Sequence, residues 1–387
     1  MTFSTLALIG LTGLLGPVLA LPARWHVPVI VGEIVAGVLL GPTLAGLLHP
    51  ADPTFSFLAD IGFALVMFVA GSHVPVRDPR LISGLRVGAL RALGVGAVSV
   101  LPAFALARAF HTGHTALYAV LIASSSAALI LPITDAAKLD GPGLLELLPQ
   151  VAIADTACIV AVPLAIDPAH AGRAALGALA VIAAAAVLFV LLRRAEHSGI
   201  RRRVHRISEQ RKFAIELRVS LTVLFGLAAL AVATHVSIML AGFSLGLAVA
   251  AVGEPRRLAR QLFAVTEGFF SPLFFLWLGA ELNLRQLGTH PTFILLGLAL
   301  GAAAIAAHAL MRTTGQPVAL GVLAASQLGV PVAAATLGTQ THNLVPGEAA
   351  ALMLGALVTI IAAALISPLL PGRPAPAQNS LADHGDH

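Results

Sequence analysis

The chain has 387 residues, of which 58% are hydrophobic and only 11% are charged. Soluble domains usually carry about a quarter charged residues, so this composition excludes an ordinary soluble protein and predicts an integral membrane protein. The single cysteine, Cys158, excludes an internal disulfide and a cysteine-rich metal site.

Apolar stretches follow one another along almost the whole chain. About 20 mostly apolar residues are needed to span the hydrocarbon core. We therefore expect an all-α membrane protein of about thirteen transmembrane helices, in one membrane domain over residues 1–370, followed by a disordered cytoplasmic tail over 371–387. In chain order the predicted helices cover residues 4–21, 27–48, 55–74, 84–109, 115–137, 145–166, 172–192, 214–234, 236–252, 258–283, 291–312, 316–338 and 346–370.

The basic residues predict the orientation. Residues 193–212 carry eight Lys and Arg, and such loops are retained in the cytoplasm. Alternation from this loop leaves only Arg108, Arg173 and Arg285 outside, so the N-terminus is predicted outside and the C-terminus inside. The loop is interpreted as a topology anchor beside anionic lipid, and nucleic acid is not an expected partner.

Three pairs of segments indicate an internal repeat. Ala36–Gly41 resembles Ala241–Gly246 at an offset of 205, and Leu121–Ser124 resembles Leu323–Ser326 at an offset of 202. Gly71 and Gly279 end apolar runs at an offset of 208. The ninth helix comes seven positions after the second, an odd number, so the copies run in opposite directions. Two inverted six-helix repeats are typical of secondary transporters, with a site at the midplane between them.

The fifth and twelfth helices hold residues that interrupt a helix. Short polar side chains, glycine and proline all weaken the helical ladder, and unwound backbone at membrane depth is tolerated only where it is buried or lines a cavity. We predict two broken, crossing helices around a cavity, with breaks near Ser124, Ser125, Ser126 and Pro132 in one, and near Ser326, Gln327, Gly329 and Pro331 in the other.

Asp155 lies near the centre of the sixth predicted helix. A carboxylate at that depth is unfavourable unless it is protonated, paired or coordinating a cation, so protons and a cation would compete for it. We expect the ion and proton site to consist of Asp155, Thr156, Ser124, Ser125 and Ser126. No cofactor is expected, and no enzyme, because the three serines lack a His–carboxylate partner set.

Other polar groups are candidate modulators: His308, Gln327, Glu33 and Asp60. A histidine titrates near neutral pH and could respond to cytoplasmic pH, although a lone histidine in a helix is more often a hydrogen-bonded structural residue. Glu33 and Asp60 lie nearer the membrane faces, where capping and bonds between helices are equally good explanations.

Four runs resemble the monovalent cation:proton antiporter-2 family. They are Pro28–Gly37 with Leu39–Pro42, Asp60–Gly62 with Phe68–Gly71, Ser124–Ala127, and Pro272–Phe275 with Gly279. The resemblance covers residues 5 to 370 and implies a homodimer in the plasma membrane that exchanges Na⁺ or K⁺ for protons. It implies an ion-carrying core of helices 4–6 and 11–13, which moves like an elevator against a dimer-forming frame of helices 1–3 and 8–10. Asp155 matches the family's ion-binding aspartate.

Two departures from the family pattern concern stoichiometry. Electrogenic members carry an acidic residue before the aspartate, where this chain has Ala154, and a lysine in helix 11, where this chain has Ala306 or His308. One carboxylate without the lysine predicts electroneutral exchange. A sodium-coupled symporter of an organic acid would need an anion-binding group, such as a buried Arg or the N-termini of broken helices, and we expect a buried Arg to be missing from the core; a gated cation channel is the other alternative. No Gly-rich phosphate loop follows the last helix, so no nucleotide regulation is expected.

Overall fold

The computed structural model describes most of the predicted membrane region, and the part that it describes is helical with no strand. The predicted tail at 371–387 and most of the basic loop lie outside the described residues. The described ranges are 1–20, 29–74, 76–77, 79–136, 139, 141–167, 171–199, 213–234, 236–253, 256–281, 284–289 and 291–370.

The first half of the chain and the linking helix contain nine helices within these ranges. They are α1 (Phe3–Gly13), α2 (Leu15–Ala20), α3 (Val29–Leu40), α4 (Pro53–His73), α5 (Pro79–Ala109), α6 (Thr115–Ala123), α7 (Ala127–Ala136), α8 (Pro142–Ile166) and α9 (Ala171–His197). The second half contains α11 (Ile215–Ala233), α12 (Ile238–Val252), α13 (Arg256–Val265), the π-helix η2 (Thr266–Phe270), α14 (Ser271–Glu281), α15 (Leu284–Thr289), α16 (Pro291–Ala309), η3 (Leu310–Thr314), α17 (Val318–Ala324), α18 (Gly329–Gln340), α19 (Glu348–Ile366) and η4 (Ser367–Leu369).

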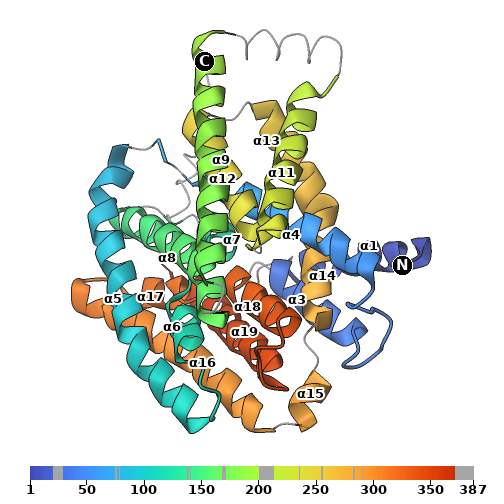
Figure 1. Ribbon diagram of the computed structural model, residues 1–387, viewed down its shortest axis with the longest axis vertical. Coiled ribbons are helices and arrows are strands. Elements are labelled where there is room, and N and C mark those ends of the chain that lie inside the picture. The colour runs from blue at the N-terminus through green and yellow to red at the C-terminus, as the bar shows by residue number, and fades with distance from the viewer. Residues whose placement is uncertain are drawn as a thin grey trace, which may run out of the picture.

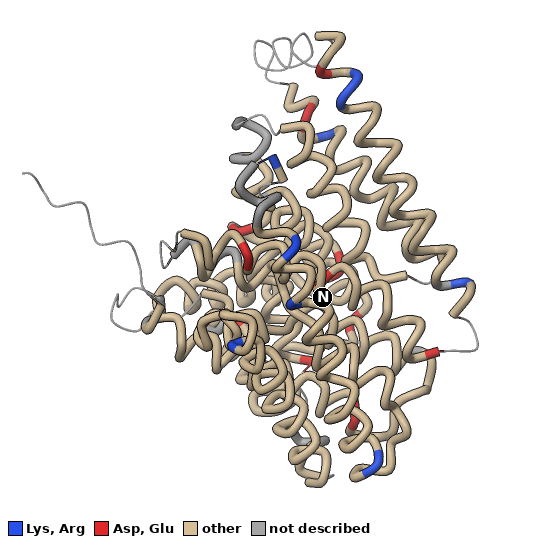
Figure 2. The backbone as a smooth tube through the Cα atoms, turned by 90° about the vertical axis from the view of Figure 1, so that its left-hand side faces the viewer, with Lys and Arg blue, Asp and Glu red and all other residues tan. Residues whose placement is uncertain are grey.

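These helices make up the thirteen predicted membrane segments. Among the described residues, 9 helices are long and apolar enough to cross a membrane. Three shorter apolar helices cover Phe3–Val18, Thr115–Ile130 and Ile238–Val252, and α3 supplies the remaining segment. The predicted all-α membrane fold is therefore confirmed. Figure 2 shows how sparse the charged residues are along the tube.

Some boundaries differ from the prediction for local reasons. The second helix was expected to reach residue 48, but α3 ends at Leu40, before Gly41 and Pro42. Proline has no N–H for the helical ladder, and the chain turns instead, with the Leu47 and Leu48 amides both donating to the Leu40 carbonyl at 2.9 Å. The tenth predicted helix contains the π-turn η2, and the short helix α15 was not predicted.

The helices pack in pairs that correspond between the two halves. The most extensive contacts join α4 to α12 and α3 to α14, and likewise α5 to α8 and α16 to α19. The repeat relates α4 to α14 and α12 to α3, so the first two pairs are equivalent. It likewise relates α5 to α16 and α8 to α19, so the last two pairs are equivalent, as an inverted repeat requires. Figure 1 shows α5, α6, α8, α16 and α17 on one side, α1, α3, α4 and α14 on the other, and α9 between them.

Glycines allow the closest of these contacts. A Cβ on Gly37 would collide with the Leu276 carbonyl and the Cα of Gly279, and one on Gly279 would collide with the Ile34 carbonyl. Gly71 and Gly246 meet in the same manner between α4 and α12. Small residues let helix backbones approach closely in lipid, where no hydrophobic effect drives association.

We predict that Gly279→Val destabilises the protein. The added side chain must push α3 and α14 apart, and overpacking of this kind typically costs about 1–3 kcal/mol, or a fall in Tm of several degrees. Thermal unfolding in detergent measures the effect. The matched control is Gly10→Val, because a Cβ on Gly10 meets nothing within 4 Å. Equal Tm values for the two variants would contradict the packing described.

A buried carboxylate fastens the start of α19 to the start of α6. Glu348 is 0% exposed. Its Oε1 lies 2.7 Å from His114 Nδ1 and accepts the Tyr118 hydroxyl at 2.6 Å, while Oε2 accepts the Val345 amide at 2.9 Å. The hydrogen bond to Glu348 raises the pKa of His114 above its ordinary value of 6.5, against the opposing effect of partial burial.

The raised pKa of His114 predicts a pH-dependent stability. A group whose pKa is higher in the folded state adds stability that is fully present below the unfolded pKa and is lost as pH rises through the folded value. Thermal unfolding from about pH 5.5 to about pH 8.5 should therefore show a loss of Tm above pH 6.5 that His114→Gln lacks. His342→Gln is the control, and an unchanged profile in His114→Gln would refute the prediction.

Candidate functional site

Both predicted breaks are present, and the two broken helices cross. The fifth helix is interrupted between α6 and α7 at Ser124, Ser125 and Ser126, and the twelfth between α17 and α18 around Ser326 and Gln327. The last turn of a helix leaves carbonyls without partners. Ser124 Oγ donates to the Leu121 carbonyl and Ser326 Oγ to the Leu323 carbonyl, each at 2.8 Å. These two hydrogen bonds lie at equivalent positions of the repeat.

The two breaks also bind each other. Ser125 Oγ donates to the Ala324 carbonyl at 2.6 Å, at the end of α17. Gln327 Nε2 donates to the Leu121 carbonyl at 2.6 Å, in the last turn of α6. Each unwound segment thus satisfies a carbonyl at the end of the other half-helix. We call this arrangement the crossing, defined by residues 121–127 and 323–329.

Asp155 projects from α8 onto the crossing. It is 1% exposed, and its Oδ2 accepts the Ala127 amide, the first of α7, at 2.9 Å. The positive end of the α7 dipole favours a negative charge there. The other oxygen, Oδ1, and the neighbouring Ser126 hydroxyl are buried without a hydrogen-bond partner in the described part of the chain. Buried polar atoms normally have partners, so these two atoms fit a bound proton or cation.

His308 reaches the crossing from α16. Its Nδ1 lies 2.9 Å from the Ala304 carbonyl and its Nε2 lies 3.4 Å from Ser125 Oγ. The carbonyl can only accept, so Nδ1 carries a hydrogen. Of the predicted modulators, His308 and Gln327 therefore contact the crossing.

The remaining predicted residues lie on α3 and α4 or directly after Asp155 on α8. Glu33 is buried on α3, where it interacts electrostatically with Glu267. Asp60 is half-buried on α4, and Thr156 is half-buried on α8. Neither Glu33 nor Asp60 makes a hydrogen bond to the crossing within the described residues.

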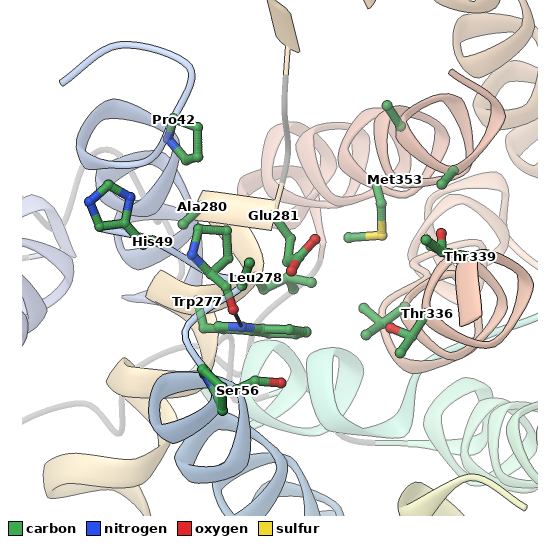
Figure 3. A pocket seen from close by; sticks show the side chains of 17 residues that line it. Pro42, His49, Ser56, Trp277, Leu278, Ala280, Glu281, Thr336, Thr339 and Met353 are labelled. Atoms are coloured by element: carbon green, nitrogen blue, oxygen red, sulfur yellow. Dashed lines mark hydrogen bonds between the residues drawn. The ribbon is translucent and has the colours of Figure 1, made fainter. Parts of the chain in front are cut away.

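A cavity of about 600 Å³ lies between the ends of α4 and α14 on one wall and α18 and α19 on the other. Figure 3 shows Trp277, Glu281 and Met353 around it, with the Trp277 indole donating to the Pro50 carbonyl at 3.1 Å. Glu281 is the single carboxylate among its described lining residues. A smaller apolar cavity shares Leu278, Val332 and Met353 with it and continues to Leu328, beside Gln327 in the break.

Arg91 corrects the expectation that the core lacks a buried arginine. It is 3% exposed on α5. Its Nη1 pairs with Glu146 Oε2 at 2.8 Å, Nε donates to Thr314 Oγ1 at 2.9 Å, and Nη2 donates to the Thr314 carbonyl at 3.3 Å. The guanidinium thus joins α5, α8 and η3, and each of its three nitrogens makes a hydrogen bond. Its position well inside the apolar run at 84–109 is the sequence signal that identifies it.

Comparison with curated proteins finds relatives along most of the chain. YjbQ of Bacillus subtilis, whose name reads "Putative Na(+)/H(+) antiporter", is 24% identical over 383 residues, 92% of this chain and 61% of the relative. The chain therefore spans about three-fifths of the length of YjbQ. Antiporter 3 of Methanocaldococcus jannaschii, named as a probable Na⁺/H⁺ antiporter, is 24% identical over 68% of this chain and 67% of its own.

A solved structure and a family model also match this chain. The sodium proton antiporter MjNhaP1 of Methanocaldococcus jannaschii, in its structure at pH 8, matches with a TM-score of 0.67 at 14% identity, over 95% of this chain and 99% of that chain. This match concerns the fold. The family model described as "Sodium/hydrogen exchanger, transmembrane" matches residues 7–371, nearly the whole chain. The chain is a multi-pass membrane protein that belongs to the sodium/hydrogen exchanger family.

Proposed function

We propose that this chain is a secondary antiporter that exchanges a monovalent cation, Na⁺ or K⁺, for protons at Asp155. The observation that carries the proposal is the buried carboxylate with one oxygen on the Ala127 amide and the other unpartnered. Cation and proton then occupy the same oxygen in turn, which couples their fluxes in opposite directions. The relatives that are named as Na⁺/H⁺ antiporters support it.

Ser126 is the second ligand in this proposal, because its hydroxyl is free. Ser124 and Ser125 donate their hydroxyl hydrogens to carbonyls, so their oxygen lone pairs remain available to a cation. Thr156 is a further candidate ligand, because it follows Asp155 on α8. Na⁺ and K⁺ are held by carboxylate, hydroxyl and carbonyl oxygens. His308 and Gln327 modulate the site through the crossing, whereas Glu33 and Asp60 act from the frame helices.

The proposed transport motion is based on the cavity of about 600 Å³ that Trp277 lines. One wall belongs to α4 and α14 and the other to α18 and α19, so a shift of α5–α8 and α16–α19 against α1–α4 and α11–α14 would open or close it. We propose these two groups as core and frame of an elevator, a homodimer formed through the frame, and a plasma-membrane location with the N-terminus outside and the C-terminus cytoplasmic.

Asp155→Asn is predicted to abolish coupled exchange. In proteoliposomes with an entrapped pH dye, an imposed Na⁺ or K⁺ gradient should move protons through the native protein. The variant keeps an oxygen for Ala127 but has no proton to release, so its flux should fall at least about a hundredfold, as for other groups on which a proton transfer depends.

Glu196→Gln, which neutralises a carboxylate near the end of α9, is the matched control and should exchange normally. The proposal would be contradicted if no monovalent cation gradient drove a proton flux through the native protein. It would also be contradicted if the proton flux through Asp155→Asn equalled that through the native protein. Proton-independent cation flux would instead indicate a channel.

We further predict one proton per cation. With the membrane potential set by an ionophore, the cation gradient at which net proton flux stops should not move with voltage, because an electroneutral cycle carries no net charge. A null point that shifts with voltage would show that a second charge moves.

A sodium-coupled symporter of an organic acid is the weaker candidate. Such an acid needs an anion-binding group, either a buried Arg or the N-terminus of a broken helix. The buried Arg91 is already paired with Glu146, and the first amide of α7 is already bonded to Asp155.

A further inference from the structure

Asp155 has a counterpart in the second repeat. The offsets of 202 to 208 that relate the repeats place the counterpart of Asp155 on α8 within Leu357–Ala363 on α19, where Thr359 is the single polar residue. Thr359 is fully buried. The sixth and thirteenth helices hold equivalent places, since α8 packs on α5 as α19 packs on α16.

The two residues make similar backbone contacts, although the two donating amides, those of Ala127 and Gln327, are not at equivalent positions of the repeat. The Ala127 amide in the first break donates to Asp155 Oδ2 at 2.9 Å, and the Gln327 amide in the second break donates to Thr359 Oγ1 at 3.1 Å. Each side chain therefore accepts an N–H that the interruption of a helix leaves without its ladder partner. An unpaired N–H at this depth would be strongly unfavourable.

The two residues differ in what remains free. Asp155 keeps Oδ1 unpartnered, whereas the Thr359 hydroxyl also donates to the Ala356 carbonyl at 2.7 Å. Thr359 thus has no charge and no spare hydrogen. Beside the first break, one carboxylate oxygen of Asp155 has no partner. Beside the second break, the Thr359 hydroxyl both accepts and donates a hydrogen bond.

We propose that Thr359 is a positioning residue of the exchange site, which holds the second break in the shape that the first break requires. By fixing the Gln327 backbone, it aims Gln327 Nε2 at the Leu121 carbonyl, three residues before Ser124. The end of α6 and the serines beside Asp155 then keep their geometry. This inference rests on the proposed exchange at Asp155.

Thr359→Val tests the proposal because it removes the hydroxyl at nearly constant shape. Loss of the bond leaves the buried Gln327 amide unpaired, and we expect the KM for the driving cation to rise about tenfold while the maximal rate changes much less. Thr359→Ser restores a hydroxyl and should return KM to near the native value. Thr222→Val is the control, since the Thr222 hydroxyl donates only to Arg218 of its own helix at 2.8 Å.

Amide hydrogen exchange gives a second readout that needs no transport. The peptide containing Gln327 should exchange about tenfold faster in Thr359→Val and at the native rate in Thr359→Ser. A purely structural defect would lower the maximal rate and the yield without moving KM. An unchanged KM with native protection of Gln327 would overturn the proposal. If the native protein moves no protons, the proposed exchange fails, and hydrogen exchange at Gln327 alone still decides whether Thr359 holds the break.

Discussion

Two interrupted helices cross inside the apolar interior, and every backbone group freed by the interruptions must find a partner within the protein. Lipid supplies none. The chain meets this requirement reciprocally, since Ser125 binds the end of α17 and Gln327 binds the end of α6. The freed amides of Ala127 and Gln327 go to Asp155 and Thr359. These last two bonds join α8 and α19 to the crossing.

Within this closed network the unsatisfied atoms stand out. Asp155 Oδ1 and Ser126 Oγ are buried without partners, whereas the buried charges Arg91 and Glu348 are each surrounded by several. A site that must bind and release an ion needs such unpartnered oxygen atoms. Among the described residues, single unpartnered atoms also occur on Thr112, Gln150, Thr266 and Gln316, but Asp155 is the one carboxylate among them. Glycine contacts such as Gly37 with Gly279 hold α3 and α14 closely packed beside it.

Sequence reasoning predicted the fold and both breaks because they depend on local chemistry: apolar length, and Ser, Gly and Pro within it. The repeat predicted which helices correspond. Sequence reasoning missed the end of α3 at Leu40, although Gly41 and Pro42 were a local signal for it. It also missed the π-turn η2, which no residue pattern in the sequence indicates. The position of Arg91 inside an apolar run marked it as buried, but its partners, Glu146 and Thr314, lie 55 and 223 residues away and have no local sequence signal. The bond from Gln327 to Leu121 spans 206 residues and likewise has no local sequence signal.

The most direct test is to locate a heavy monovalent cation. Crystals of the protein soaked with thallium(I) would show the ion by its anomalous scattering. The account predicts a peak in contact with Asp155 Oδ1, on the side of Ser126, that vanishes in Asp155→Asn. A peak between Glu33 and Glu267 with none at Asp155, or a peak at Asp155 that survives the substitution, would contradict it.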